Sequence, residues 1–180
     1  KQSICVSRSF SSEIYDVKEL QEQIANFSAS MAEKLRKQCS VVSEIVVFAY
    51  TNRFKENEPQ THGSALISFI TPTADVRVIV SKAVAATKAL FKEGYGYKKA
   101  GVIATKISSD KCIMHSLFED TEASEREHKI TTVLDNINKT FGKGTIKLAV
   151  QGTGHIKSSS DNQSPHYTTL WTDIPTVTVK

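Results

Sequence analysis

The sequence predicts an α+β fold in which four antiparallel strands form one sheet, two helices pack on one face of it, and a small α/β extension follows. Three observations predict this fold. Short segments rich in β-branched and aromatic residues recur along the chain. Amphipathic stretches with helical spacing separate them. The resulting order is β-α-β-β-α-β, the order of the ferredoxin-like split unit, which leaves the second face of the sheet free for a partner. Because this topology serves many functions, it indicates none by itself.

The first strand is predicted over residues 4–10, which are β-branched and aromatic. Asp16 follows as the expected N-cap of the first helix, and Glu19 stands three residues later, where it completes a capping box. Apolar residues then recur at helical spacing and predict the buried stripe of this helix. The stripe consists of Val17, Leu20, Ile24, Phe27, Met31 and Leu35.

Residues 41–50 are predicted to form the second strand, and they are apolar on both faces, so we expect this strand to be central in the sheet. Residues 51–63 contain asparagines, a proline, a glycine and several charges, which are typical of a long solvated hairpin loop. Residues 64–71 are the predicted third strand. The three segments together indicate a hairpin.

The second helix is expected to open at Pro72 and to be followed by Gly94 as a left-handed C-terminal cap. Residues 97–107 are the predicted fourth strand, which completes the first domain, residues 1–110. The core stripe of the helix is expected to be Val76, Val80, Val84, Thr87 and Phe91.

Residues 111–123 show no sustained periodicity and are interpreted as a linker, and residues 124–180 as a C-terminal extension. In the extension, Ser124 is expected to cap a third helix whose apolar stripe ends at Phe141. Residues 145–151 alternate as a strand would. The extension is small for a core of its own, so we expect it to pack on the first domain or on a partner.

Composition excludes several classes of protein. The chain has 180 residues, of which 39% are hydrophobic, as expected for one packed domain and a smaller unit. No apolar run approaches the roughly 20 residues of a membrane-spanning helix, and no signal peptide opens the chain. Because a strand-like segment starts at once after Lys1, we expect the chain to be a fragment of a longer protein.

No catalytic or metal-binding motif is found. The three cysteines form no Cys-x-x-Cys pair and are interpreted as reduced thiols, and the five histidines lack metal-ligand spacing. The G-x-S-x-G, H-E-x-x-H and P-loop patterns are missing, and the acidic residues fall mostly on helix faces and in loops. We therefore predict no catalytic residue and no metal site, which disfavours a small hydrolase.

The charge of the chain is uneven. Residues 1–110 carry 15 Lys and Arg against 11 Asp and Glu, whereas residues 111–180 carry eight against eight. Positive side chains and hydroxyls fall on the first and fourth predicted strands, which we expect to be the edges flanking the open face. Such groups bind phosphates without reading bases, although edge lysines also prevent aggregation between sheets. The candidate DNA backbone contacts are Ser7, Arg8, Ser9, Lys98, Lys99 and Lys106.

Three motifs carry a resemblance to a known family: Ser-Arg-Ser-Phe at 7–10, Tyr-Lys-Lys-Ala-Gly-Val at 97–102, and Ser-Pro-His-Tyr-Thr-Thr at 164–169 with Trp171. The sequence resembles the C-terminal third of UmuC-type Y-family DNA polymerases, the polymerase subunits of bacterial SOS mutagenesis. Residues 1–110 are similar to the little finger domain, and residues 124–180 to the tail that follows it.

The resemblance implies that the sheet lies in the major groove and holds the backbone of template-primer DNA. Lys98 and Lys99 match a basic pair that contacts phosphates, and Ser7 and Arg8 match the contact region of the first strand. Ile103 stands where some relatives carry a basic residue, so one contact is missing. The resemblance places Mg²⁺ and catalysis in a palm domain upstream. This region is therefore expected to hold no cofactor and to be inactive, although its parent is a DNA-directed DNA polymerase.

The segment from Met114 to Phe118 aligns with the family's clamp-binding peptide, Gln-x-x-Leu-Phe, with Met114 in place of the glutamine. Leu117 and Phe118 would fill an apolar pocket of the sliding clamp; alternatively, they pack on their own domain. The other implied partners are template-primer DNA, a UmuD-type accessory subunit and the recombinase filament, with no membrane. The implied location is the bacterial cytoplasm, at the nucleoid.

The sequence therefore indicates the DNA-binding and clamp-docking C-terminal region of an error-prone translesion polymerase that acts in SOS repair and mutagenesis. The alternative is a non-enzymatic adaptor whose open sheet face binds a protein. The moderate charge and the neutral tail support this alternative.

Overall fold

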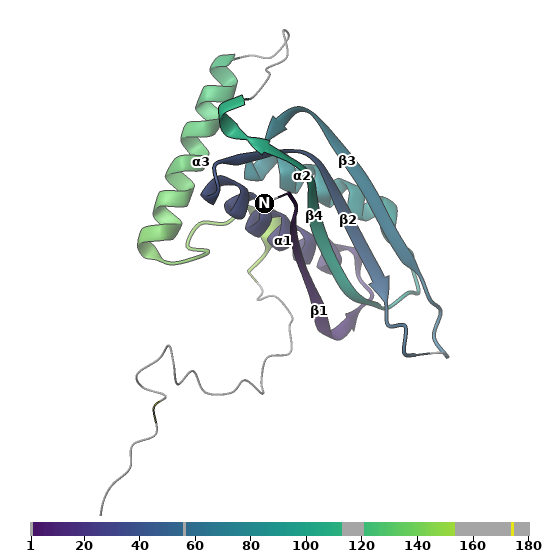
Figure 1. Cartoon of the computed structure of the whole chain (residues 1–180). Helices are drawn as coiled ribbons and strands as arrows, with labels where there is room; N and C mark the ends of the chain where they lie inside the picture. Colours follow the sequence, from purple (N-terminus) through teal and green to yellow (C-terminus); the bar gives the residue numbers. More distant parts are fainter. Residues whose placement is uncertain (1, 56, 113–120, 154–173, 175–180) are drawn as a thin grey trace, which may run out of the picture.

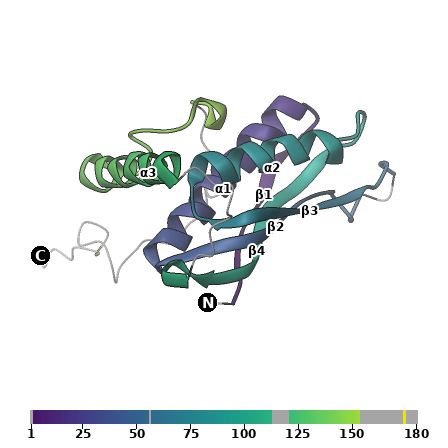
Figure 2. The same ribbon diagram turned by 90° about the horizontal axis from the view of Figure 1, so that it is seen from above.

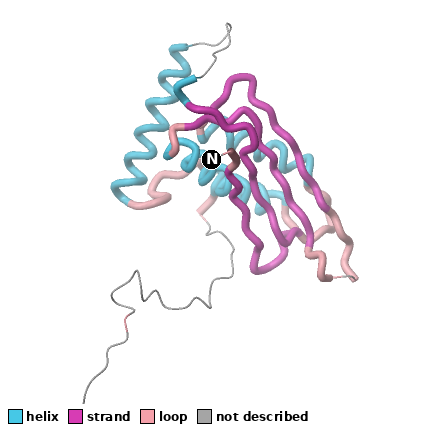
Figure 3. The backbone as a smooth tube through the Cα atoms, in the orientation of Figure 1, coloured by secondary structure: helices cyan, strands magenta, loops and turns pink. Residues whose placement is uncertain are grey.

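The computed structural model describes residues 2–55, 57–112, 121–153 and 174. It confirms the predicted order β-α-β-β-α-β (Figure 1). Figure 3 shows the four strands as one layer beside the helices. The elements in chain order are β1 (Ile4–Ile14), α1 (Val17–Lys37), β2 (Ser40–Thr51), β3 (His62–Thr73), α2 (Val76–Leu90), β4 (Tyr97–Ser109), the 3₁₀ turn η1 (Asp110–Cys112), α3 (Thr121–Phe141) and the 3₁₀ turn η2 (Ala149–Gln151).

The strands form one sheet in the order β1-β4-β2-β3, and every neighbouring pair is antiparallel. The central position predicted for β2 is confirmed. The prediction that β4 is an edge strand is wrong, because β4 lies between β1 and β2. Its residues suit an interior position: Ala100, Val102 and Ala104 are completely buried on the helix side.

Helices α1 and α2 cover one face of the sheet, and the opposite face carries none of the described helices (Figure 2). The side chain of Asp16 accepts hydrogen bonds from the backbone amides of Lys18 and Glu19, at 3.3 and 3.4 Å, so the predicted N-cap of α1 is confirmed. Within the predicted stripe, the residues from Leu20 to Leu35 are completely buried. The ring of Phe27 stacks on Phe10 of β1 at 6.4 Å between centroids, which joins helix and sheet.

The boundaries of α2 differ from the prediction. Strand β3 continues through Pro72, and the helix begins after Asp75, whose side chain accepts a 2.7 Å hydrogen bond from the amide of Arg77. At the other end, the C-cap is Phe91 in an extended conformation. Gly94 has the expected positive φ, 82°, but lies in a turn beyond the helix.

The extension contains α3, which begins at Thr121 before the predicted cap at Ser124. The predicted strand over 145–151 is wrong: η2 occupies its end, and no fifth strand joins the described part of the sheet. The side chain of Asn138 on α3 takes both backbone groups of Ile146, accepting from its amide at 2.9 Å and donating to its carbonyl at 3.0 Å. The side-chain amide of Asn138 therefore makes the two backbone hydrogen bonds that a neighbouring strand would otherwise make with Ile146. None of the described helices is long and apolar enough to cross a membrane.

Candidate nucleic-acid interface on the open sheet face

The register of β2 and β4 decides which side chains lie on the open face. Residues that pair directly across two strands point to the same face, and the next pair points to the other. Ala49 and Ala100 pair and are buried beneath the helices. The adjoining pairs, Tyr50 with Lys99 and Phe48 with Gly101, therefore lie on the open face.

The same register places the candidates on β1. Ser9 pairs with Lys99 and Ser7 with Gly101, so both serines lie on the open face. Arg8 pairs with the buried Ala100 and therefore lies on the helix side of the edge strand, where it is exposed to solvent. The structure thus separates Arg8 from the two serines on either side of it, contrary to the prediction that all three flank one face.

The three lysines of β4 differ in their surroundings. Lys98 lies at a shift in the β2–β4 register, and its Nζ donates to the Ser11 carbonyl at 3.1 Å. On the open face, Lys106 forms a 2.6 Å ion pair with Glu44, so its charge is compensated. Lys99 forms no such pair with a described carboxylate. Among the three, Lys99 is therefore the cation best placed to meet a phosphate on the open face.

Sequence reasoning missed an aromatic row beside Lys99. The rings of Phe48 and Tyr50 stack at 6.1 Å between centroids, and Tyr50 stacks on His62 of β3 at 5.9 Å. The Nζ of Lys99 and the guanidinium of Arg53 each lie 5.8 Å from the centre of the Tyr50 ring. Alternate residues of a strand share a face, so Phe48 and Tyr50 could have been found from the spacing alone. The partner from β3 depended on the hairpin register.

Gly101 makes the open face flat beside Phe48. A Cβ atom at Gly101 would lie 2.4 Å from the Ser7 Cβ and 2.7 Å from the Phe48 Cζ, closer than real side chains approach. The missing side chain therefore leaves room for the Phe48 ring and the side chain of Ser7 beside Gly101. The hydroxyls of Ser7 and Ser9 share this face with the ammonium of Lys99, and both kinds of group bind phosphates.

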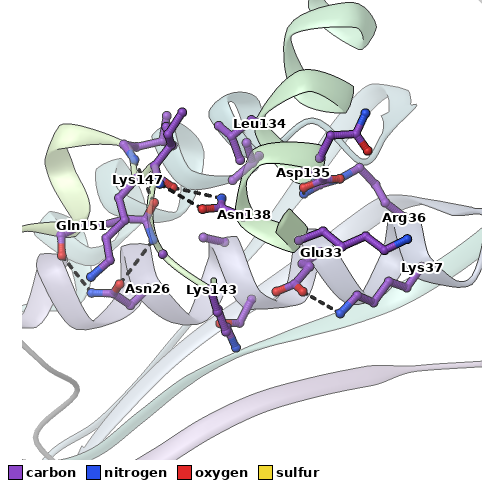
Figure 4. A pocket seen from close by; sticks show the side chains of 18 residues that line it. Asn26, Glu33, Arg36, Lys37, Leu134, Asp135, Asn138, Lys143, Lys147 and Gln151 are labelled. Carbon is purple, nitrogen blue, oxygen red and sulfur yellow. Dashed lines mark hydrogen bonds and ion pairs between the residues drawn. The ribbon is translucent and has the colours of Figure 1, made fainter. Parts of the chain in front are cut away.

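The extension docks on α1, away from the open face, and encloses a cavity of about 890 Å³ with it (Figure 4). At one end of the cavity, the guanidinium of Arg36 grips the carboxylate of Asp135 on α3 with contacts of 2.6 and 2.7 Å. A third contact from Arg36, at 2.8 Å, reaches the carbonyl of Ala74. Asn26 and Gln151 close the other end. Of the predicted site residues that the structure describes, none lines this cavity.

The predicted clamp contacts Met114, Leu117 and Phe118 lie outside the described residues. Within the described part of the chain, no group of three or more His, Cys, Asp or Glu residues could hold a metal ion. Cys5 and Cys39 are exposed free thiols.

Two family models match the chain: the impB/mucB/samB family C-terminal domain over residues 1–117, and the domain of unknown function DUF4113 over residues 128–177. Protein UmuC of Salmonella typhimurium is 34% identical over 175 residues, which cover 97% of this chain and 42% of that protein. Protein MucB of Escherichia coli is 32% identical over 181 residues, with 100% and 42% covered. The chain thus spans about two fifths of the length of these relatives.

Among solved structures, the chain is similar to one from a complex of the β-clamp processivity factor and the little finger domain of PolIV. The similarity has a TM-score of 0.44 and 12% sequence identity, and it covers 65% of this chain and 99% of the other.

Proposed function

We propose, from the premise that this chain belongs to the impB/mucB/samB family, whose C-terminal domain matches residues 1–117, that it is the DNA-binding and clamp-docking region of an error-prone translesion DNA polymerase. In this proposal the region acts in SOS repair and mutagenesis in the bacterial cytoplasm, at the nucleoid. It grips template-primer DNA, while catalysis and its Mg²⁺ belong to another part of the parent polymerase.

The observation that carries the proposal is the grouping of Lys99, Arg53 and Tyr50 on the open face. The two cations hold their charge over an aromatic ring, and neither forms an ion pair with a carboxylate of the described residues, so we expect them to be available to phosphates. The hydroxyls of Ser7 and Ser9 lie on the same face, at the positions of β1 that pair with Gly101 and Lys99. Contacts of this kind hold a duplex in register without reading its sequence. A grip that ignores the bases suits an enzyme that copies damaged template.

The test is a titration with labelled primer-template DNA at two salt concentrations. Affinity should fall as salt rises, because each neutralised phosphate releases counterions. Lys99→Ala should weaken binding to every sequence and lower the slope of log affinity against log salt by about 0.9. The matched control is the double variant Glu44→Ala, Lys106→Ala, which removes an ion pair between β2 and β4 and leaves the net charge of the open face unchanged. The double variant Lys98→Ala, Lys99→Ala should bind more weakly still, and unchanged binding by it would contradict the proposal.

Clamp docking is the second part of the proposal, and its support is the Leu117–Phe118 pair in the peptide pattern of the sequence. Leu117→Ala with Phe118→Ala should abolish pull-down of the sliding clamp while leaving DNA affinity unchanged. A double variant that still binds the clamp would refute this part alone. A UmuD-type subunit and the recombinase filament are further proposed partners of the parent protein.

An adaptor function is the second candidate, and apolar side chains on β3 favour it. Leu66 on this edge strand is 62% exposed and Ile70 is 96% exposed, and both lie beside the open face. Exposed apolar groups in one place are typical of a protein-binding surface. The same titration distinguishes the two functions: an adaptor should show no salt-dependent affinity for primer-template DNA.

A further inference from the structure

Phe54 stands at the tip of the β2–β3 hairpin with 94% of its surface exposed. The hairpin projects beyond the rest of the sheet (Figure 2). Phenylalanine is among the residues most often buried, and here its ring on a projecting loop is free to contact a partner. Neither the core nor the open face accounts for it.

The loop that carries Phe54 is held by its own hydrogen bonds. The side-chain amide of Gln60 donates to the carbonyls of Asn52 and Lys55, at 3.0 and 2.9 Å. The backbone amide of Phe54 donates to the side-chain oxygen of Asn52 at 3.1 Å. These bonds fix the backbone on both sides of Phe54, so the exposure of the ring follows from the built shape of the loop.

A pair of carboxylates ties the loop to the sheet. The Nζ of Lys55 lies 2.9 Å from Glu13 at the end of β1 and 2.8 Å from Glu58 within the loop. The charge of Lys55 is therefore neutralised. The cation left beside Phe54 is Arg53, whose guanidinium reaches back over Tyr50 on the open face. The Cα atoms of neighbouring residues are about 3.8 Å apart. Phe54 therefore lies directly beside Arg53, whose side chain contacts the open face.

We propose that Phe54 is a stacking site for an unpaired nucleobase of the DNA that lies on the open face. This inference rests on the proposed DNA-binding function and adds a substrate class to it: duplex with a single-stranded extension. A base inside a duplex is stacked on both faces, whereas an unpaired base in an overhang is free to lie on a protein ring. Arg53 beside the ring can meet the phosphate of the same nucleotide.

The test compares two DNA ligands of equal duplex length, one with blunt ends and one with a single-stranded template overhang. Loss of a stacking ring weakens binding to single strands roughly 5- to 150-fold. Phe54→Ala should therefore lose affinity for the overhang ligand by a factor in this range and keep its affinity for the blunt duplex. The fluorescence of a 2-aminopurine placed in the overhang should be quenched by the unchanged protein and not by Phe54→Ala.

Two further variants separate stacking from other roles of an exposed ring. Phe54→Trp should keep the preference for the overhang, because tryptophan also stacks. Phe54→Leu keeps an apolar side chain but has no π face, so it should behave as Phe54→Ala does. Full overhang affinity in Phe54→Leu would overturn the proposal, because an apolar side chain without a π face would then be sufficient for the contact with DNA. Thermal unfolding should be the same in all variants, since the ring is exposed.

The binding test distinguishes failure of the stacking proposal from failure of the proposed DNA-binding function. If Phe54→Ala binds both ligands as the unchanged protein does, stacking is refuted and the phosphate grip stands. If it weakens both ligands equally, the ring does not select an unpaired base and the inference is again overturned. If the unchanged protein binds neither ligand at low salt, the proposed function and the stacking site both fail.

Discussion

Asn26 and Gln151 are 125 positions apart in the chain and hydrogen-bond to each other twice. The Asn26 Nδ2 donates to the Gln151 carbonyl at 3.0 Å, and the Gln151 Nε2 donates to the Asn26 Oδ1 at 3.2 Å. The side-chain oxygen of Gln151, Oε1, accepts a hydrogen bond from the backbone amide of Leu148 at 2.9 Å. Both side chains are buried. The pair thus joins η2 to the middle of α1 (Figure 4).

We predict that Gln151→Ala releases η2 from α1 without unfolding the sheet domain. The substitution leaves the buried Oδ1 of Asn26 and the amide of Leu148 without a partner, and each such loss costs about 1–3 kcal/mol. Hydrogen exchange should therefore become faster over residues 142–152 and stay slow in β2 and β4. Asn136→Ala is the control, because Asn136 is an exposed amide on α3. Unchanged exchange in Gln151→Ala would show that other contacts hold the extension.

Local patterns were sufficient to predict the helices and strands of the first domain. The stripe from Leu20 to Leu35 and the cap at Asp16 are short-range features, and both are present in the structure. The position of β4 depends on where the chain returns after α2, which no local spacing specifies. The alternation of residues 145–151 predicted a strand, but no strand forms there. The side chain of Asn138 instead binds the backbone amide and carbonyl of Ile146.

For the candidate site, the sequence indicated residue types but not how these residues are arranged on the sheet. Lys99 and the two serines are on the open face, but Arg8 is on the other side, since the pairing register is a long-range property. The compensation of Lys106 by Glu44 joins residues 62 positions apart and was not visible in the sequence. The contact of Arg53 with the ring of Tyr50 was not predicted from the sequence either. The sequence indicated phosphate chemistry, whereas the choice among its cations required the structure.

We predict that Gly101→Ala destabilises the sheet by about 1–3 kcal/mol, because its new methyl group would overlap Ser7 and Phe48. Urea unfolding measures the change. Gly94→Ala is a control of a different kind: nothing lies within 4 Å of its added methyl group, and the strain comes only from φ at +82°. That strain is about 1–2 kcal/mol. Adding Ser7→Gly should restore part of the stability of Gly101→Ala and none of that of Gly94→Ala.

The hydroxyl of Tyr97 closes the end of α2. It donates to the Leu90 carbonyl at 3.1 Å and accepts from the Lys92 amide at 2.9 Å, and burial raises the pKa of this phenol. Tyr97→Phe keeps the ring but leaves both backbone groups unpaired, so we predict a loss of about 1–3 kcal/mol in the free energy of unfolding. Tyr95→Phe, in the half-buried ring two residues earlier, should change stability much less. Equal stability of the two variants would mean that water replaces the Tyr97 hydroxyl.

Glu13 makes the stability of the hairpin loop dependent on pH. The hydrogen bond from Lys55 holds the pKa of Glu13 below its usual value of 4.5, with a smaller contribution from the Tyr15 hydroxyl, which donates at 3.0 Å. Burial opposes this shift, as it favours the neutral acid. Because the folded pKa is lower than the unfolded one, the ionised carboxylate stabilises the folded protein above pH 4.5, and this contribution disappears as pH falls through the folded pKa.

We therefore predict that the protein loses stability in acid more steeply than its Glu13→Gln variant, which has no proton to bind at this position. Urea unfolding between about pH 7 and pH 3 should show the unchanged protein as more stable at neutral pH, with the difference shrinking below the unfolded pKa. Glu93→Gln, in the exposed turn after α2, is the matched control and should follow the unchanged protein across the range. A constant difference between the protein and Glu13→Gln at every pH would mean that the ion pair with Lys55 does not contribute to folding.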